Sequence, residues 1–224
     1  MKNHMGKISI GLIVVLLGAA FWYAAEAGKK ANEGIVVTTT QVKGNSEAAV
    51  VLTEYSDFQC PACAAAAPVA AALVEQYGDS LRFEYKHFPL ISIHPHAVAA
   101  AVAAEAAGQQ GKFWEMHDML FAKQTTWAPT ASPQVYFIEY ATELGLDVDQ
   151  FKLQLGSSVL ESSVRQSFND VRAKGYTGTP TFELNGKRLE FTSYEELAQI
   201  VAATITGEAP MAAQAPAVDV EFGI

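Results

Sequence analysis

The sequence predicts an α/β protein in which a long helical block interrupts an arrangement of strands and helices. Short apolar runs near residues 48–55, 81–86 and 180–189 are bounded by polar or turn residues, which is typical of strands. Between the second and third runs, residues 94–174 follow a helical pattern nearly throughout, punctuated by glycine and proline, and we expect four or five helices there. The 224 residues suffice for one domain with an insertion, or for a small domain with an accessory one.

Composition and charge exclude some classes of partner. Half of the residues are hydrophobic, which allows a sizeable core, and the formal net charge is -9. We expect no nucleic-acid partner, because phosphate binding needs a clustered basic surface. The two cysteines are too few for a disulfide scaffold, and a zinc site would need two more ligands, for which His94 and His96 are the candidates. Neither Cys-x-x-Cys nor His-x-His supplies the paired knuckle of a structural zinc site, so we expect no metal.

The start of the chain is directed to a membrane. Two lysines precede the uncharged run Ile8–Ala25, and Trp22 and Tyr23 close this run where an interfacial aromatic belt would lie. Residues 1–27 are either a retained anchor or a signal peptide cleaved after Ala25-Glu26-Ala27. We favour the anchor, because the bulky aromatic residues make a poor cleavage site. Either alternative places the rest of the chain outside the cytoplasm, in the periplasm or on the outer face of the cytoplasmic membrane.

Composition also suggests the domain boundaries. The polar, Thr-rich residues 28–46 are expected to be a tether, to which Ile35-Val36-Val37 would add an edge strand. The Ala- and Pro-rich residues 207–224 are expected to be disordered. The folded part then consists of a first section, residues 47–90, the helical insertion 91–174, and a second section, residues 175–206.

Both cysteines lie in Cys60-Pro61-Ala62-Cys63, directly after the first strand and at the start of an Ala-rich helix. A sulfur at a helix N-terminus lies among N–H groups without intrahelical partners, and the helix dipole favours a thiolate there. We therefore expect Cys60 to be the exposed, low-pKa nucleophile and Cys63 the shielded thiol that resolves a mixed disulfide. Pro61 suits the first helical position. A purely structural pair is less favoured, because so short a disulfide loop restricts the unfolded chain weakly.

Later signals define the remaining elements. Pro68 lies inside the Ala-rich helix and is expected to kink it. Asn185-Gly186 separates the two halves of the last strand pair and predicts a hairpin with a type I′ turn. Ser193, with Glu196 at the capping-box spacing, predicts a final helix that extends to about Thr206.

This order of elements, together with four groups of residues, resembles the thioredoxin fold with an inserted all-helical domain. Such a fold occurs in the DsbA family of extracytoplasmic thiol–disulfide oxidoreductases and in its membrane-anchored, BdbD-like branch. The resemblance spans about residues 44–206. The motifs that carry it are Glu54-Tyr-Ser-Asp-Phe-Gln-Cys-Pro-Ala-Cys63, Phe88-Pro-Leu90 followed by His94-Pro-His96-Ala97, Gly111-Lys-Phe-Trp114 with Met116-His117, and Gly178-Thr-Pro-Thr181.

The resemblance implies roles for residues outside the cysteine motif. It implies a cis peptide bond before Pro180, beside the sulfurs, which leaves the backbone of Thr179 free to pair with an extended substrate. The Thr179 hydroxyl is then a candidate partner of the Cys60 sulfur. Glu54 matches a buried acid that relays a proton to the resolving cysteine. The alternative is that Glu54 points to solvent at the end of its strand.

The two residues between the cysteines are expected to tune the redox couple. Strongly oxidising members of the family carry a histidine where Ala62 stands, and that histidine stabilises the reduced thiolate. With Pro61 and Ala62 between the sulfurs, we expect a less extreme potential and a less depressed pKa of Cys60. Three other histidines are interpreted as helix-terminal or surface residues, namely His94, His96 and His117. Three residues at helical spacing are interpreted as core of the insertion, namely Phe113, Trp114 and Met119.

The function that the resemblance implies is donation of the Cys60–Cys63 disulfide to reduced cysteines of exported proteins. A quinone-linked membrane partner of the DsbB or VKOR type would reoxidise the protein, and no cofactor other than the disulfide is expected. Two alternatives stay open: a disulfide reductase or isomerase of the same fold, and a tethered peptide-binding chaperone without redox turnover. The Pro61-Ala62 dipeptide does not decide between them.

Overall fold

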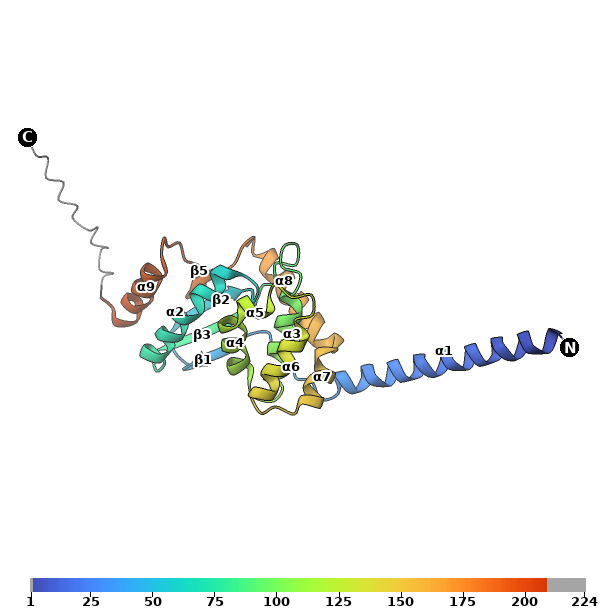
Figure 1. Cartoon of the computed structure of the whole chain (residues 1–224). Coiled ribbons are helices and arrows are strands. Elements are labelled where there is room, and N and C mark those ends of the chain that lie inside the picture. Colours follow the sequence, from blue (N-terminus) through green and yellow to red (C-terminus); the bar gives the residue numbers. More distant parts are fainter. Residues whose placement is uncertain (1, 209–224) are drawn as a thin grey trace, which may run out of the picture. The chain divides into compact units, whose positions relative to one another are not determined.

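The computed structural model describes residues 2–208, with side chains from residue 11 onward (Figure 1). The disorder predicted for residues 207–224 lies, from residue 209 onward, outside the described residues. The chain divides into two compact units. We call Met1–Thr38 with Ile91–Gln166 the helical unit, and Thr39–Leu90 with Ser167–Ile224 the sheet unit.

A five-stranded sheet forms the centre of the sheet unit, in the order β1-β3-β2-β4-β5. Strands β2 and β3 are parallel, and the other neighbours are antiparallel. Because β2 and β3 are parallel, the loops that follow them leave from the same edge of the sheet, and the loop after β2 carries Cys60. The strands are β1 (Gln41–Gly44), β2 (Val50–Ser56), β3 (Leu81–His87), β4 (Thr181–Leu184) and β5 (Lys187–Arg188).

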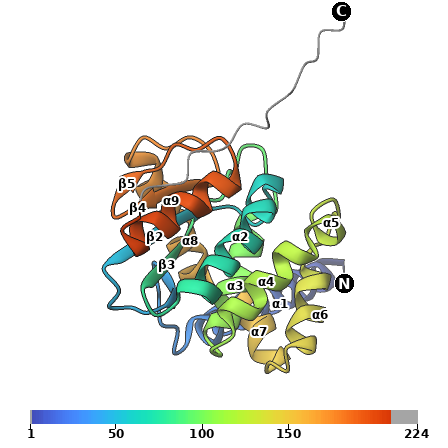
Figure 2. The same ribbon diagram turned by 90° about the vertical axis from the view of Figure 1, so that its left-hand side faces the viewer.

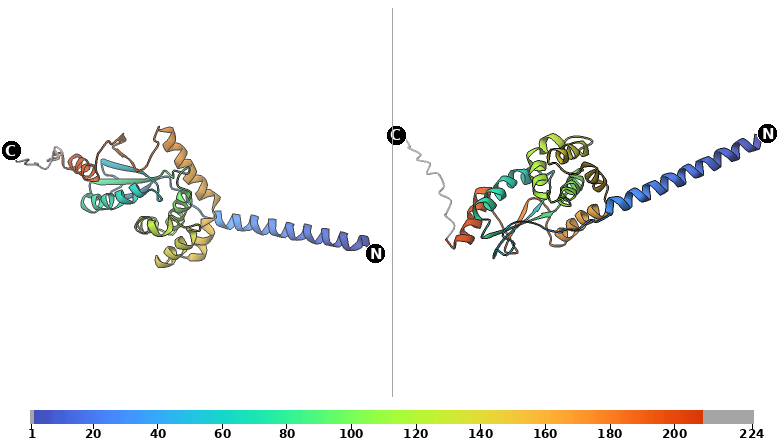
Figure 3. Two further views of the ribbon diagram at one scale, coloured as in Figure 1. Left: turned by 45° about the horizontal axis from the view of Figure 1, so that its top comes forward. Right: turned by 90° about the horizontal axis from the view of Figure 1, so that it is seen from below.

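Helices α2 (Pro61–Tyr77) and α9 (Tyr194–Thr206) pack on each other and on the sheet (Figures 2 and 3). Small residues of α2, including Ala66 and Ala70, are buried, which lets the helix lie close to its neighbours. The Ser193 hydroxyl caps α9 by accepting from the Glu196 N–H over 3.2 Å, as predicted. The Glu196 carboxylate, however, accepts from Thr192 rather than from the Ser193 N–H that a full capping box would use.

The hairpin that closes the sheet follows the prediction. Asn185 and Gly186 have φ values of 51° and 77°, the positive values that a type I′ turn needs at both central positions. The Asn185 side chain also accepts from the Val51 N–H, and its own N–H donates to the Val51 carbonyl, both over 2.8 Å. The turn is therefore bonded to the central strand as well as to its own hairpin.

The helical unit is built around α3, an alanine helix that is buried over most of its length. Because alanine side chains are short, neighbouring helices approach it closely, and α4, α6 and α7 all contact it. Trp127 closes this core: its indole N–H donates to the Leu120 carbonyl over 2.8 Å, and its ring packs on Phe137. The helices are α1 (Lys2–Asn32), α3 (Ala97–Gly108), α4 (Phe113–Ala122), α5 (Gln124–Trp127), α6 (Gln134–Glu143), α7 (Val148–Leu155) and the first part of α8 (Ser158–Ala173).

The segment expected to be a tether, residues 28–46, is ordered into secondary structure at both ends. Helix α1 continues to Asn32, whose side chain bonds the hydroxyls of Ser157 and Ser158 over 2.8 and 3.1 Å. The edge strand is Gln41–Gly44, not Ile35-Val36-Val37. The reason is that the Gln109 side-chain amide already bonds both the N–H and the carbonyl of Val36, at 2.8 and 2.9 Å.

The predicted insertion also differs from the structure in number of helices and in extent. Residues 91–174, all of which are described, contain six helices, α3 to α8, rather than four or five. The last turns of α8 group with the sheet unit, because Phe168 and Val171 pack in a cluster with Tyr55 and Phe88 of the sheet unit. Within the described residues, one helical stretch, Gly11–Asn32, is long and apolar enough to span a membrane, so the N-terminal helix fits a signal or an anchor.

Candidate active site

The two cysteines occupy unequal positions at the start of α2. Cys60 is the N-cap residue, with an extended backbone at φ -78° and ψ 122°, and Pro61 takes the first helical position, as predicted. Both cysteines are free thiols, with Cys60 7% exposed and Cys63 fully buried. The expectation that Cys60 is exposed is therefore wrong. Thr179, the residue before Pro180, covers the Cys60 sulfur, and the Cys60 thiol donates to the Thr179 carbonyl over 3.4 Å.

The pKa values of the two thiols are displaced in opposite directions. A hydrogen bond from the Cys63 thiol lowers the pKa of Cys60 to about 5, although burial opposes the shift. The Thr179 side chain and the backbone N–H groups of Cys63 and Ala62 lower it further. Burial, followed by the hydrogen bond with Cys60, raises the pKa of Cys63 well above its ordinary value. One sulfur thus favours the thiolate and the other the thiol, which is the asymmetry that stepwise dithiol–disulfide exchange needs.

Glu54 lies in β2 with its carboxyl group on the cysteine side. The residue is 1% exposed, so the alternative that it points to solvent is wrong. Burial raises the pKa of Glu54 to about 7, although the Ser56 hydroxyl donates to it over 2.6 Å. The charge of Glu54 in turn raises the pKa of Cys63, and a hydrogen bond from Ser56 to Cys63 lowers it. Ser56 therefore interacts with both the acid and the resolving thiol, and its single hydroxyl proton is donated to one of them at a time.

Sequence reasoning missed Asp57, which shapes the loop before Cys60. Its carboxylate is buried and accepts from the Gln59 N–H over 2.7 Å and from the Leu90 N–H over 2.8 Å. Its own N–H points to the Cys63 sulfur at 3.5 Å, and its carbonyl accepts from the Cys60 N–H over 3.0 Å. An aspartate that bonds an N–H two residues later is a known turn signal, so this role was visible in the sequence.

The loop between α8 and β4 brings Thr179 and Pro180 to the sulfurs. The Thr179–Pro180 peptide bond is cis. The Thr179 carbonyl accepts from the reduced Cys60 thiol over 3.4 Å, and the Thr179 side chain lowers the pKa of Cys60 by hydrogen bonding. Among the described residues, the buried Thr179 hydroxyl has no hydrogen-bond partner while Cys60 is a thiol. A thiolate at Cys60 would provide an acceptor, consistent with the lowering of the Cys60 pKa by this side chain.

Tyr194 is a second residue that the sequence did not single out. It is the first residue of α9, and its hydroxyl donates to the backbone carbonyl of Ala62 over 2.7 Å. Ala62 itself is exposed, as is Pro61. The Cys60-Pro61-Ala62-Cys63 turn is therefore held from three directions, by Asp57, by the Thr179 loop and by Tyr194.

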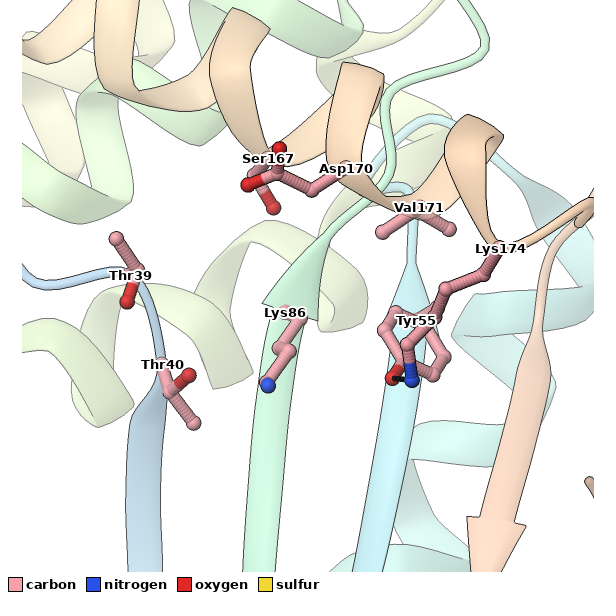
Figure 4. Close-up of a pocket in the computed structure, with 8 residues that line it drawn as sticks. All are labelled: Thr39, Thr40, Tyr55, Lys86, Ser167, Asp170, Val171 and Lys174. Carbon is pink, nitrogen blue, oxygen red and sulfur yellow. Dashed lines mark hydrogen bonds between the residues drawn. The ribbon is translucent and has the colours of Figure 1, made fainter. Parts of the chain in front are cut away.

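The opposite face of the sheet carries a separate charged cluster. Side chains alternate along a strand, so Tyr55 and Lys86 point away from the face that holds Glu54. A pocket of about 160 Å³ opens there, and in Figure 4 Tyr55 and Lys174 point toward one another. Lys174 Nζ lies 2.6 Å from the Tyr55 hydroxyl and 2.6 and 2.9 Å from the Glu183 carboxylate oxygens. The pocket is lined by Thr39, Thr40, Tyr55, Lys86, Ser167, Asp170, Val171 and Lys174.

The three histidines all lie in the helical unit. His96 is the N-cap residue of α3, as a helix-terminal histidine was expected to be. His117 was expected at a helix end or on the surface, and this is wrong, because it is buried in α4 among aromatic rings. Its Nδ1 lies 2.7 Å from the Asp118 carboxylate. Of the residues expected in this core, Phe113 is buried, whereas Trp114 and Met119 are half-buried.

The sheet topology, the paired thiols at the start of α2 and the inserted helices define a thioredoxin-fold protein of the DsbA-like type. The family model described as thioredoxin matches residues 37–203, and the chain therefore belongs to this family. A thioredoxin-like oxidoreductase from Silicibacter pomeroyi DSS-3 has a similar structure: it is 26% identical, with 77% of this chain and 95% of that chain covered, at a TM-score of 0.62. BdbD from Bacillus subtilis, 20% identical, has the same fold, with coverages of 77% and 96% and a TM-score of 0.65.

Curated relatives are similar over most of this chain but are much longer. The Na(+)/H(+) antiporter NhaA 3 of Salinispora tropica is 35% identical over an alignment of 205 positions that covers 82% of this chain and 30% of the relative. The Na(+)/H(+) antiporter NhaA 1 of Salinispora arenicola is 38% identical, and the alignment again covers 82% of this chain and 30% of the relative. The matched part of this chain necessarily includes most of residues 37–203, so the likeness concerns the thioredoxin-like part.

Proposed function

We propose that this protein is a thiol–disulfide oxidoreductase that donates the Cys60–Cys63 disulfide to reduced cysteines of exported proteins. The observation that carries the proposal is the opposite displacement of the two thiol pKa values at the start of α2. A stabilised thiolate at Cys60 favours the reduced form of the protein, and this makes the disulfide a better oxidant. The Cys60 pKa of about 5 lies between the values of about 3.5 and about 7 typical of strongly oxidising and reducing relatives of this fold.

The proposed reaction has two exchange steps. A substrate thiolate attacks the Cys60 sulfur, the bond between Cys60 and Cys63 breaks, and Cys63 leaves as a thiolate. A second substrate thiolate then attacks the substrate sulfur of the mixed disulfide, and Cys60 leaves as a thiolate. Two electrons pass from the substrate dithiol to the protein. Cys60 leaves most easily, because its thiolate is stabilised first by the hydrogen bond from the Cys63 thiol and then by the Thr179 side chain and backbone N–H groups.

The leaving Cys63 needs a proton, because burial disfavours its thiolate. We propose that Glu54 supplies this proton: when protonated, its carboxyl group donates to the Ser56 oxygen, 2.6 Å away, while Ser56 passes its own hydroxyl proton to the Cys63 sulfur. A carboxylic acid with a pKa of about 7 is half protonated at neutral pH and returns to that state after each turnover.

The apolar N-terminal helix supports the proposal that the protein is held at a membrane, with the sheet unit outside the cytoplasm. A membrane quinone-linked partner of the DsbB or VKOR type would then reoxidise the dithiol. Regeneration requires an oxidant in any case, because each substrate disulfide leaves the protein reduced.

The test is the redox equilibrium of the whole chain, in detergent, with glutathione buffers, with the state of Cys60 and Cys63 followed by alkylation. The whole chain is preferable to a fragment that begins near Ala31, because Ala31 is buried and Asn32 is bonded to Ser157. A potential near -120 mV, or clearly above about -200 mV, supports disulfide donation. A potential near -270 mV assigns the protein to the reductases, and the absence of a reversible disulfide leaves the peptide-binding alternative.

A matched pair of variants tests the order of attack. Cys63→Ser should accumulate a mixed disulfide with a disulfide-containing peptide, because the Cys60 thiolate attacks the peptide disulfide, one peptide sulfur leaves as a thiolate, and the resolving thiol is missing. Cys60→Ser should accumulate none, because the remaining sulfur is fully buried. Equal trapping by both variants would contradict the assignment of the two roles.

A further inference from the structure

The hydroxyl of Tyr194 contacts the backbone between the two cysteines. It donates to the Ala62 carbonyl over 2.7 Å, across a separation of 132 positions in the chain. Both residues belong to the sheet unit, in which α9 packs on α2. A side chain of one helix therefore binds the first turn of the helix that carries the thiols.

The Ala62 carbonyl and the Cys63 N–H belong to the same planar peptide group and point in opposite directions. That N–H hydrogen-bonds to the Cys60 sulfur and stabilises its thiolate. Hydrogen bonds arranged in a line polarise one another, by about 10–30% per bond. The Tyr194 hydroxyl, the peptide between Ala62 and Cys63, and the Cys60 sulfur form such a line.

We infer that Tyr194 is a positioning residue for the cysteine pair: its hydroxyl fixes and polarises the Ala62–Cys63 peptide, and the Cys63 N–H thereby stabilises the Cys60 thiolate more strongly. The inference rests on the proposed function, which it deepens. It assigns to Tyr194 part of the thiolate stabilisation that a histidine at position 62 would otherwise supply. No bond is made or broken by Tyr194, which acts as a hydrogen-bond donor only.

The surroundings keep Tyr194 in the donor state. Burial, and then the negative charges of Cys63, Glu54 and Cys60, raise the pKa of the phenol to about 12. The hydroxyl therefore retains its proton at every pH at which Cys60 titrates. The contact is also separable from packing, because the Tyr194 ring contacts Phe191, at 6.0 Å between centroids, through atoms that a phenylalanine retains.

The test compares Tyr194→Phe with Tyr176→Phe in the whole reduced chain in detergent. Tyr176 is the matched control, because its hydroxyl donates to Glu183, on the face of the sheet opposite to Glu54. Thiolate formation is followed at 240 nm against pH. Tyr194→Phe should raise the pKa of Cys60 by about 0.3 to 1 unit, a two- to tenfold loss of thiolate stabilisation, and lower the potential by about 10 to 30 mV. Tyr176→Phe should change neither.

Two further readouts separate this mechanism from a general loss of structure. The amide proton of Cys63 should move upfield in Tyr194→Phe, because its hydrogen bond to the sulfur weakens. Fluorination at the 3-position of the Tyr194 ring makes the hydroxyl a stronger donor and should shift the Cys60 pKa in the opposite direction, downward.

The outcomes distinguish this inference from the proposed function. An unchanged Cys60 pKa in Tyr194→Phe, or equal shifts in both phenylalanine variants, overturns the role of Tyr194 and leaves a depressed wild-type pKa intact. A wild-type Cys60 that titrates near its ordinary value of about 8.5 overturns the proposed function and this inference together.

Discussion

Replacing Glu54 with glutamine should stabilise the protein, and the gain should depend on pH. Glu54 is fully enclosed, and burial raises its pKa from 4.5 to about 7. Below pH 4.5 the carboxyl group is protonated in both the folded and unfolded states, so it contributes no pH dependence. Between pH 4.5 and 7 only the unfolded state loses the proton, so the free energy of unfolding of the wild type falls. Above pH 7 the loss is constant at about 3 kcal/mol, since each pKa unit corresponds to about 1.4 kcal/mol.

The assay is urea unfolding of reduced wild type and Glu54→Gln at pH 4 and at pH 8. Glutamine retains an oxygen that accepts from Ser56, so the variant should gain about 3 kcal/mol relative to the wild type between these pH values. Using the difference between the two proteins removes the contribution of Cys60, whose lowered pKa makes folding increasingly favourable as the pH rises from about 5 toward the ordinary value of about 9. Glu105→Gln, at a buried position in α3 of the helical unit, is the matched control. An equal difference at both pH values would refute the assignment of a protonated, buried acid beneath the cysteines.

Two further substitutions test the tuning of Cys60 and the cluster on the opposite face. Ala62→His places an imidazole at an exposed position between the sulfurs and should lower the Cys60 pKa below about 5. The redox potential should rise by about 30 mV for each tenfold gain in thiolate stability. An unchanged equilibrium with glutathione would contradict this prediction. Glu183→Gln weakens the hydrogen bonds from Tyr55, Lys174 and Tyr176 and should lower the free energy of unfolding, measured in urea, by about 1–3 kcal/mol. These partners lower the pKa of the Glu183 carboxyl group, so the loss should shrink at acid pH, where the wild-type carboxylate is protonated. A loss independent of pH would show that the charge of Glu183 is not what stabilises this cluster.

The sequence predicted the features that depend on neighbouring residues. The Asn185-Gly186 turn, Pro61 at the first helical position and the Ser193 cap all follow from local backbone chemistry, and the structure confirms them. Cysteine spacing likewise indicated which sulfur would have the lowered pKa. The burial of Cys60 was not predictable in this way, because the Thr179 carbonyl that covers it comes from a loop 119 positions later.

Contacts between distant residues account for the other differences. Residues 28–46 have the composition of a tether, and nothing local to them shows that Asn32 would bond Ser157, 125 positions away. The same holds for Tyr194 and Ala62. A tyrosine at the start of a helix is an ordinary helix residue until the helix that it faces is known.

The position of Glu54 beneath the cysteines depends on the register of β2. Tyr55 belongs to the opposite face, where it bonds Glu183 and Lys174, so a shift of one residue would exchange the two side chains between faces. Three sets of contacts prevent such a shift: Asn185 bonds both backbone groups of Val51, β2 pairs with β3 over seven residues, and β2 pairs with β4 from Leu52 to Tyr55. The charged cluster on one face therefore supports the redox site on the other. Any substitution that lets Tyr55 leave its cluster should also disturb Glu54, although the two side chains point in opposite directions.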